Sequence, residues 1–211
     1  LTLLQNAGAI ASAYDFHWQR FLFDNFPKGT GFPKLDAPAI AQELPLANVQ
    51  AYSIDDSQTT EIDDALSLQG LGSGTVVVGI HIAAPGLAIE PHSAIDNVGR
   101  NRLSTVYMPG YKITMLPDDV VQSYTLAEGQ ACPAVSLYVT FDEATLSIQH
   151  SETKLERVPI NANLRHDQLD QWVTQAWLED STPAAREGEP QLPIAHNELA
   201  FFWRLAQHLK A

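Results

Sequence analysis

Five carboxylates fall within ten residues of this chain, on a segment that contains no lysine or arginine. The segment is Ile54–Leu66, which reads IDDSQTTEIDDAL, and its acidic residues are Asp55, Asp56, Glu61, Asp63 and Asp64. Crowded carboxylates repel one another, and burying one costs free energy unless something pairs with it. The segment therefore predicts either a solvated acidic turn or a binding site for a hard cation.

Strand-like sequence on both sides restricts where this acidic segment can lie. Ala51–Ile54 and Ala65–Leu71 have the composition of strands, and Thr75–Ala83 (TVVVGIHIA) is a β-branched run long enough to be buried. Gly70–Gly74 (GLGSG) is typical of a hairpin turn between two such strands. We therefore expect the acids to lie on turns between strands, close to a hydrophobic core.

The rest of the chain contains both helical and strand-like segments. Leu1–Asn25 predicts one or two short helices, and Lys34–Pro45 predicts a linker with one short helix after Pro38. Ala134–Phe141 and Thr145–Glu156 predict an antiparallel strand pair. Further predicted helices are Ser93–Thr105, Leu164–Glu179 and His196–Ala211. A polar surface loop is predicted at Ser181–Pro193.

These segments together predict an α/β (α+β) fold. We expect a mixed, largely antiparallel sheet with helices packed on it, preceded by a short helical segment. Residues 1–45 are predicted to form the N-terminal helical segment and linker, and residues 46–211 the main domain. The chain starts at Leu1 and stops inside a helical pattern, so we expect it to be part of a longer protein.

The composition restricts the classes of partner. Twelve basic and 25 acidic residues give a net charge of −13, which taken alone argues against a polyanion because no basic stripe is present to collect phosphates. Cys132 is the only cysteine, which indicates a reducing compartment and favours a cytoplasmic location. We expect no membrane partner, since no apolar run approaches the length that spans a bilayer.

Magnesium is the cation that best suits such a carboxylate segment. Mg²⁺ prefers oxygen ligands and is usually held by one or two carboxylates together with substrate phosphate oxygens. Glu61 and Asp63 would share one face of a strand while Asp64 points away, so convergence needs a bent loop, which Ser57–Thr60 can supply. A helix-loop-helix calcium site is excluded, because the required Gly and the closing Glu are missing. On composition alone, a solvated acidic hairpin is as consistent with the segment as a metal site.

Three motifs resemble the catalytic (RNB) domain of the ribonuclease II and ribonuclease R family. They read IDDSQTTEIDDAL, VGIHIA and RLSTVYMPGYKITMLP, and their order and spacings match those of the family. The most specific feature is Arg102, which stands five residues before Tyr107 of a Tyr-Met-Pro-Gly turn that Met-Leu-Pro follows. The likeness runs from about Leu46 to Ala211 and covers the first half of that domain.

The resemblance implies a magnesium-dependent hydrolytic exoribonuclease that degrades single-stranded RNA from its 3′ end to nucleoside 5′-monophosphates. Tyr107 falls where the family stacks a tyrosine on a nucleotide near the 3′ end. Arg102 falls on a basic residue of the same segment and is expected to contact phosphate, and Arg100 lies two residues before it. The acidic catalytic positions of the family, which hold Mg²⁺, fall on Asp55, Glu61, Asp63 and Asp64.

The sequence also departs from the family pattern. Glu61 stands where the family usually has Asp, and Ala84 stands where it usually carries a further Asp. The Arg-Arg-Tyr-type motif of the later half is not found, so we expect the remainder of the catalytic domain beyond Ala211 to be required. We also expect that remainder to supply the basic half of the RNA channel. The alternative hypothesis is a catalytically inert RNA-binding or assembly module of the same fold.

Overall fold

The computed structural model describes residues 1–36, 38–181, 183, 188 and 190–210. It divides into two compact units that are interleaved along the chain. Leu1–Asp36 and His92–Pro117 form the first, here called the hairpin unit. Ala37–Pro91 and Asp118–Ala211 form the second, here called the barrel unit. The prediction that the main domain starts at residue 46 stays a prediction.

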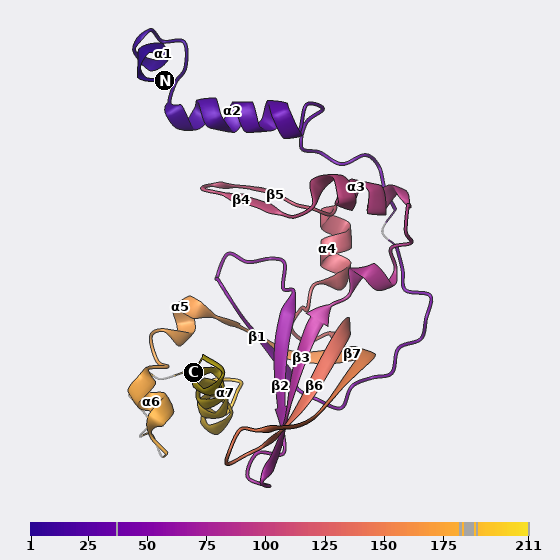
Figure 1. Cartoon of the computed structure of the whole chain (residues 1–211), viewed down its shortest axis with the longest axis vertical. Helices are drawn as coiled ribbons and strands as arrows, with labels where there is room; N and C mark the ends of the chain where they lie inside the picture. Colours follow the sequence, from indigo (N-terminus) through magenta and orange to yellow (C-terminus); the bar gives the residue numbers. More distant parts are fainter. Residues whose placement is uncertain (37, 182, 184–187, 189, 211) are drawn as a thin grey trace. The chain divides into compact units, whose positions relative to one another are not determined.

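The barrel unit is built on five strands that close into a barrel (Figure 1). Their order is β1-β2-β3-β6-β7, and each neighbouring pair is antiparallel except β1 and β7, which run parallel from Ala51↔Ile160 to Asp55↔Arg165. The predicted mixed, largely antiparallel sheet is therefore confirmed. The strands are β1 (Ala51–Asp55), β2 (Asp64–Gln69), β3 (Thr75–Ala83), β6 (Ala131–Asp142) and β7 (Ile148–Arg165).

A histidine and two serines are buried together on neighbouring strands of the barrel. His81 is 0% exposed and lies between two buried serines, with its Nε2 2.8 Å from Ser67 Oγ and its Nδ1 2.8 Å from Ser136 Oγ. Gly79 is required beside it, because a Cβ there would collide with Ser67 Oγ and come within 2.7 Å of His81 Nε2. The polar groups inside the barrel are thus paired with each other, as burial demands.

Helices of the barrel unit pack against the outside of the barrel. α7 (His196–Lys210) places Phe201 and Leu205 in a core cluster with Val76, Val78 and other strand residues. Tyr52 and Ala162 form another cluster with residues of α5, α6 and α7. The shorter helices of this unit are η1 (Pro85–Leu87), α4 (Asp118–Tyr124), α5 (His166–Leu169) and α6 (Gln175–Glu179). Within the described part of the chain, each helix is too short or too polar to cross a membrane.

The hairpin unit contains three helices and a two-stranded sheet. Ser12 caps α2, since its hydroxyl accepts a hydrogen bond from Asp15 N, and Ser93 caps α3 in the same way through Asp96 N. None of the residues from 1 to 36 in this unit is fully buried. Its elements are α1 (Thr2–Asn6), α2 (Ala13–Asn25), α3 (Ala94–Arg102), β4 (Val106–Met108) and β5 (Tyr111–Ile113).

Two predicted helices are wrong. The described residues after Pro38 form no helix before β1, because the proline-rich segment lacks the spacing that would bury a helical face. The apolar stripe of Leu164–Glu179 does not form one helix, since β7 continues to Arg165 and two short helices follow. Leu164 at the end of β7 and Leu169 in α5 are nevertheless buried in the same core cluster. The predicted loop at Ser181–Pro193 lies partly outside the described residues.

Protonation of His81 is expected to destabilise the barrel unit. Burial lowers the pKa of His81 from 6.5 to about 4, and the negative charge of Glu156 opposes part of this shift. The folded pKa lies below the unfolded one, so the unfolded state binds more protons and stability falls as the pH decreases from 6.5 towards 4. The loss approaches roughly 3 kcal/mol. Urea unfolding at neutral pH and near pH 4.5 should show a smaller pH dependence for His81→Gln than for the native chain, and equal dependence would contradict this prediction.

Candidate active site

The acidic segment forms the loop between β1 and β2. Asp55 is the last residue of β1 and Asp64 is the first residue of β2, so two of the predicted ligands lie on strand ends. Glu61 and Asp63 lie on the connecting residues between them. The structure therefore places all four predicted acids on one loop between two strands and on its two ends.

Ile62 anchors the second half of this loop in the core of the barrel. Its side chain is 3% exposed and lies in a cluster with Ala51, Ala65 and other residues of the inner core. Its backbone is held on both sides, because Ile62 N donates to Thr125 Oγ1 at 2.7 Å and Ile62 O accepts from Leu126 N at 2.9 Å. The adjacent acids Glu61 and Asp63 are thus fixed to a buried residue between them.

Arg165 anchors the first half of the loop. Its Nη1 donates to the carbonyl oxygen of Asp56 at 2.9 Å and to that of Thr59 at 3.2 Å. Thr59 N also donates to Asp56 O at 2.9 Å, which closes a turn at this point. Arg165 was not predicted from the sequence, since its proximity to the acids follows only from the parallel register that sets it opposite Asp55.

The four carboxylates differ in their environments. Asp63 and Asp64 are exposed, whereas Asp55 and Glu61 are half-buried. Asp55 Oδ2 is buried and has no hydrogen-bond partner among the described residues. A buried carboxylate oxygen without a donor is costly, and a bound cation or a substrate group would remove this cost.

The donor set suits magnesium, although the described acids are not gathered into a cage. Carboxylate oxygens are the ligands Mg²⁺ prefers, and the unpaired Asp55 Oδ2 is an oxygen in need of a positive partner. In the described part of the chain, no three His, Cys, Asp or Glu side chains lie together as a metal-binding group. The arrangement therefore fits an ion held by one or two carboxylates with further oxygens from water or phosphate, rather than an all-protein site.

The structure gives Arg102 contacts within the hairpin unit. Its Nη1 donates to Thr114 O and its Nη2 to Thr30 O and Gly31 O, each at 2.8 Å. The guanidinium carbon also lies 3.7 Å from the ring centre of Phe32, and burial lowers the pKa of Arg102. Arg102 thus holds separate segments of this unit together, and its contact with RNA stays a prediction.

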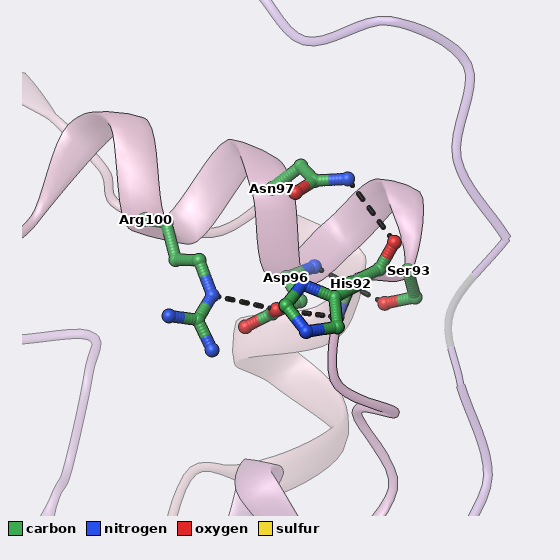
Figure 2. A network of polar contacts seen from close by, with 5 residues as sticks. All are labelled: His92, Ser93, Asp96, Asn97 and Arg100. Carbon is green, nitrogen blue, oxygen red and sulfur yellow. Dashed lines mark hydrogen bonds and ion pairs between the residues drawn. The ribbon is translucent and has the colours of Figure 1, made fainter.

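Arg100 and Tyr107 lie nearer the surface of the hairpin unit. Arg100 Nε donates to Asp96 Oδ2 at 2.7 Å, and Asp96 Oδ2 also accepts from His92 N at 2.7 Å (Figure 2). The Arg100 side chain, through its hydrogen bond, lowers the pKa of Asp96. Tyr107 lies on β4 opposite Lys112 and is 68% exposed, which leaves a large part of its ring open to stacking.

Two other features of the barrel unit have some properties of a functional site. The Ser67–His81–Ser136 group has the hydroxyl and imidazole of a nucleophilic site, but all three are at most 1% exposed and out of reach of a substrate. A pocket of about 640 Å³ lies between α6, α7 and the strand turns, lined in part by Trp203 and Arg204. It contains none of the predicted site residues. The β1–β2 loop is therefore the site that the chemistry favours.

Comparison with known proteins identifies the family. Residues 44–211 match the RNB domain, and the chain belongs to the RNB family. It is 29% identical over 164 residues to exoribonuclease 2 of Vibrio parahaemolyticus and 29% identical over 154 residues to an uncharacterized ribonuclease of Synechocystis sp.. These alignments cover 75% and 72% of this chain, but the chain spans only 25% and 22% of the two relatives. The family resemblance expected from the motifs is therefore confirmed.

Solved structures share the fold at lower sequence identity. RNase R of Mycoplasma genitalium, in complex with ribose-methylated single-stranded RNA, matches with a TM-score of 0.64 and 19% identity over 84% of this chain and 26% of its own. The Dss1 exoribonuclease of Candida glabrata matches with a TM-score of 0.67 and 18% identity, over 86% and 26%. Yeast Ssd1, a pseudonuclease, matches with a TM-score of 0.57 and 24% identity, over 67% and 18%. The RNB-like fold is thus shared by nucleases and by a pseudonuclease.

Shortening Ile62 is expected to destabilise the barrel unit and loosen the acidic loop. Ile62→Ala removes a buried side chain and should cost about 2–5 kcal/mol of unfolding free energy. Ile82→Ala is a matched control on β3, because Ile82 is 46% exposed and its truncation should cost less than about 1 kcal/mol. Denaturant unfolding of both variants measures the difference. Equal losses would show that Ile62 is not an anchor.

Replacing Arg102 is expected to open the hairpin unit locally. Arg102→Gln removes hydrogen bonds to the carbonyls of Thr30, Gly31 and Thr114, so amide hydrogen exchange in residues 28–36 should rise about tenfold. Arg100→Gln removes the same charge from an exposed pair with Asp96 and should leave exchange in these residues nearly unchanged. A comparable rise in both variants would show that Arg102 does not hold these segments together.

Proposed function

We propose that this chain supplies the acidic half of the active site of a magnesium-dependent, hydrolytic 3′-to-5′ exoribonuclease acting in the cytoplasm. Its substrate is single-stranded RNA, and its products are nucleoside 5′-monophosphates. The observation that carries the proposal is Asp55 Oδ2, which is buried without a hydrogen-bond partner among the described residues, at the start of a loop with three further acids. Membership of the RNB family supports it, because this loop bears the motif by which the chain resembles the family's nucleases.

The acids of the loop would hold the metal. Asp55, Glu61, Asp63 and Asp64 would bind Mg²⁺, which when bound neutralises charge on the scissile phosphate and activates water. Asp63 and Asp64 are exposed, so a phosphodiester can approach them from solvent. Asp55 and Glu61 are half-buried and hold their oxygens in a more restricted geometry. No side chain of this loop need serve as the nucleophile.

The hairpin unit supplies the contacts proposed for RNA. Tyr107 stacks on a base near the 3′ end, which is worth about 1–3 kcal/mol per base and tolerates any sequence. Arg100 and Arg102 are the proposed basic contacts. The hydrogen bond from Arg102 to Thr114 O also fixes the segment that carries Tyr107. RNase R of Mycoplasma genitalium, which shares the fold, binds single-stranded RNA. The remainder of the catalytic domain, which longer relatives contain, is needed for turnover.

One set of observations favours a second candidate, a catalytically inert RNA-binding or assembly module. The described acids do not form a group of three or more ligands. Glu61 also has a longer arm than the Asp usual at its position, which loosens the geometry of that ligand. Yeast Ssd1 shares the fold and is a pseudonuclease, so the fold is compatible with loss of turnover.

Digestion of a 5′-labelled single-stranded RNA separates the two candidates. The natural protein that contains residues 1–211 should shorten the RNA from its 3′ end in the presence of Mg²⁺, and EDTA should stop the reaction. Asp55→Asn should lower the rate by more than about 100-fold, because losing a metal ligand raises the activation free energy by several kcal/mol. Asp56→Asn is the matched control, since the neighbouring Asp56 side chain is exposed and should be dispensable. RNA binding without shortening would favour the inert module.

A further inference from the structure

The acidic loop receives its positive charge from a distant part of the sequence. Residues 37–91 contain seven Asp or Glu residues and no Lys or Arg, so they cannot compensate their own charge. Arg165 lies 110 residues after Asp55 in the sequence and reaches the loop because β7 pairs in parallel with β1. The closure of the barrel thus places a guanidinium against the turn that follows Asp55.

The contacts of Arg165 are made to the backbone of the loop. Its Nη1 bonds the carbonyl oxygens of Asp56 and Thr59, which are the two ends of the turn closed by Thr59 N and Asp56 O. Arg165 is half-buried, so these charge-assisted hydrogen bonds are partly shielded from water. A guanidinium bound to both ends of a turn restricts the direction in which the chain leaves Asp55.

The two anchors of the loop act on different acids. Ile62 and its hydrogen bonds to Thr125 and Leu126 fix the half that carries Glu61 and Asp63. Arg165 fixes the half that follows Asp55, whose buried Oδ2 has no hydrogen-bond partner in the part of the chain that the structure describes. Loss of Arg165 therefore releases the Asp55 side of the loop and leaves the Ile62 side in place.

We propose that Arg165 is a positioning residue that fixes the Asp55 half of the acidic loop for binding a divalent cation. This inference rests on the proposed function, since the cation site belongs to the same loop. The direction in which metal affinity changes when Arg165 is removed is informative, because a nearby positive charge repels a cation. If Arg165 acted through its charge alone, its removal would strengthen metal binding. If it acts by holding the turn, its removal weakens metal binding.

The test is direct cation binding, measured without RNA. Mn²⁺ binding by electron paramagnetic resonance, with Mg²⁺ as competitor, is compared for the native protein and Arg165→Gln. We expect the affinity of Arg165→Gln to fall about 10- to 100-fold, as is usual when a group that orients a metal ligand is lost. Arg165→Lys should recover only part of the affinity, since an ammonium on a flexible stem is held less rigidly than the planar guanidinium whose Nη1 bonds both carbonyls.

Two controls separate the positioning role from charge and from folding. Arg157→Gln removes the same charge from the same strand at a side chain bonded to Ala131 O, and it should leave Mn²⁺ affinity nearly unchanged. Amide hydrogen exchange should rise in residues 57–60 of Arg165→Gln while the exchange of β3 stays native. A variant that is unfolded throughout would lose protection in β3 as well, and Arg165→Lys would then carry the measurement.

The outcomes distinguish this inference from the proposed function. Unchanged or tighter Mn²⁺ binding by folded Arg165→Gln overturns the positioning role, even if the native protein degrades RNA. Weaker binding supports it, even if the native protein proves to be an inert module that binds the cation without turnover. Absence of Mn²⁺ binding by the native protein would overturn both proposals.

Discussion

The parallel pairing of β1 with β7 is the interaction on which the rest of the barrel unit depends. It joins the first strand to the last, so the five-stranded sheet closes and its inner face can bury His81 with its two serine partners. The same pairing sets Asp55 opposite Arg165. A sheet that stayed open here would expose unpaired strand edges. It would also leave the acidic loop without the guanidinium of Arg165, which holds its turn. Core packing and site geometry therefore rest on one set of hydrogen bonds.

The charge of the molecule is divided unevenly between its two units. The hairpin unit contains six Lys or Arg and four Asp or Glu residues, a net charge of +2, whereas the barrel unit contains six and 21, a net charge of −15. The overall value of −13 therefore conceals a mildly basic unit that also bears the exposed Tyr107. This weakens the objection to RNA that the overall charge raised. Cation binding in the barrel unit would reduce the repulsion further.

The sequence predicted what local patterns determine. The β-branched run of β3, the glycine turn before it and the carboxylates between strands were visible without coordinates, and the motifs around them led to the family. Arg165 was not predictable, because its role depends on a register between residues 110 positions apart. The apolar spacing of Leu164–Glu179 suggested one helix, but two residues at its start complete a strand whose partner lies far back in the chain. Non-local pairing overrode local pattern there.

The long sequence separation between the acidic loop and Arg165 also sets the order in which the parts of the site are synthesised. During synthesis, the segment with Asp55 and Asp64 emerges about 110 residues before Arg165, which at ordinary elongation rates is roughly 5–20 s. Through that interval the acids belong to a nascent chain whose strand partner does not yet exist, and pairing at such separation is slow to form. The candidate active site is thus completed only when β7, which carries Arg165, has been made. Until the barrel closes, the acidic loop lacks the hydrogen bonds of Arg165 that hold its first half.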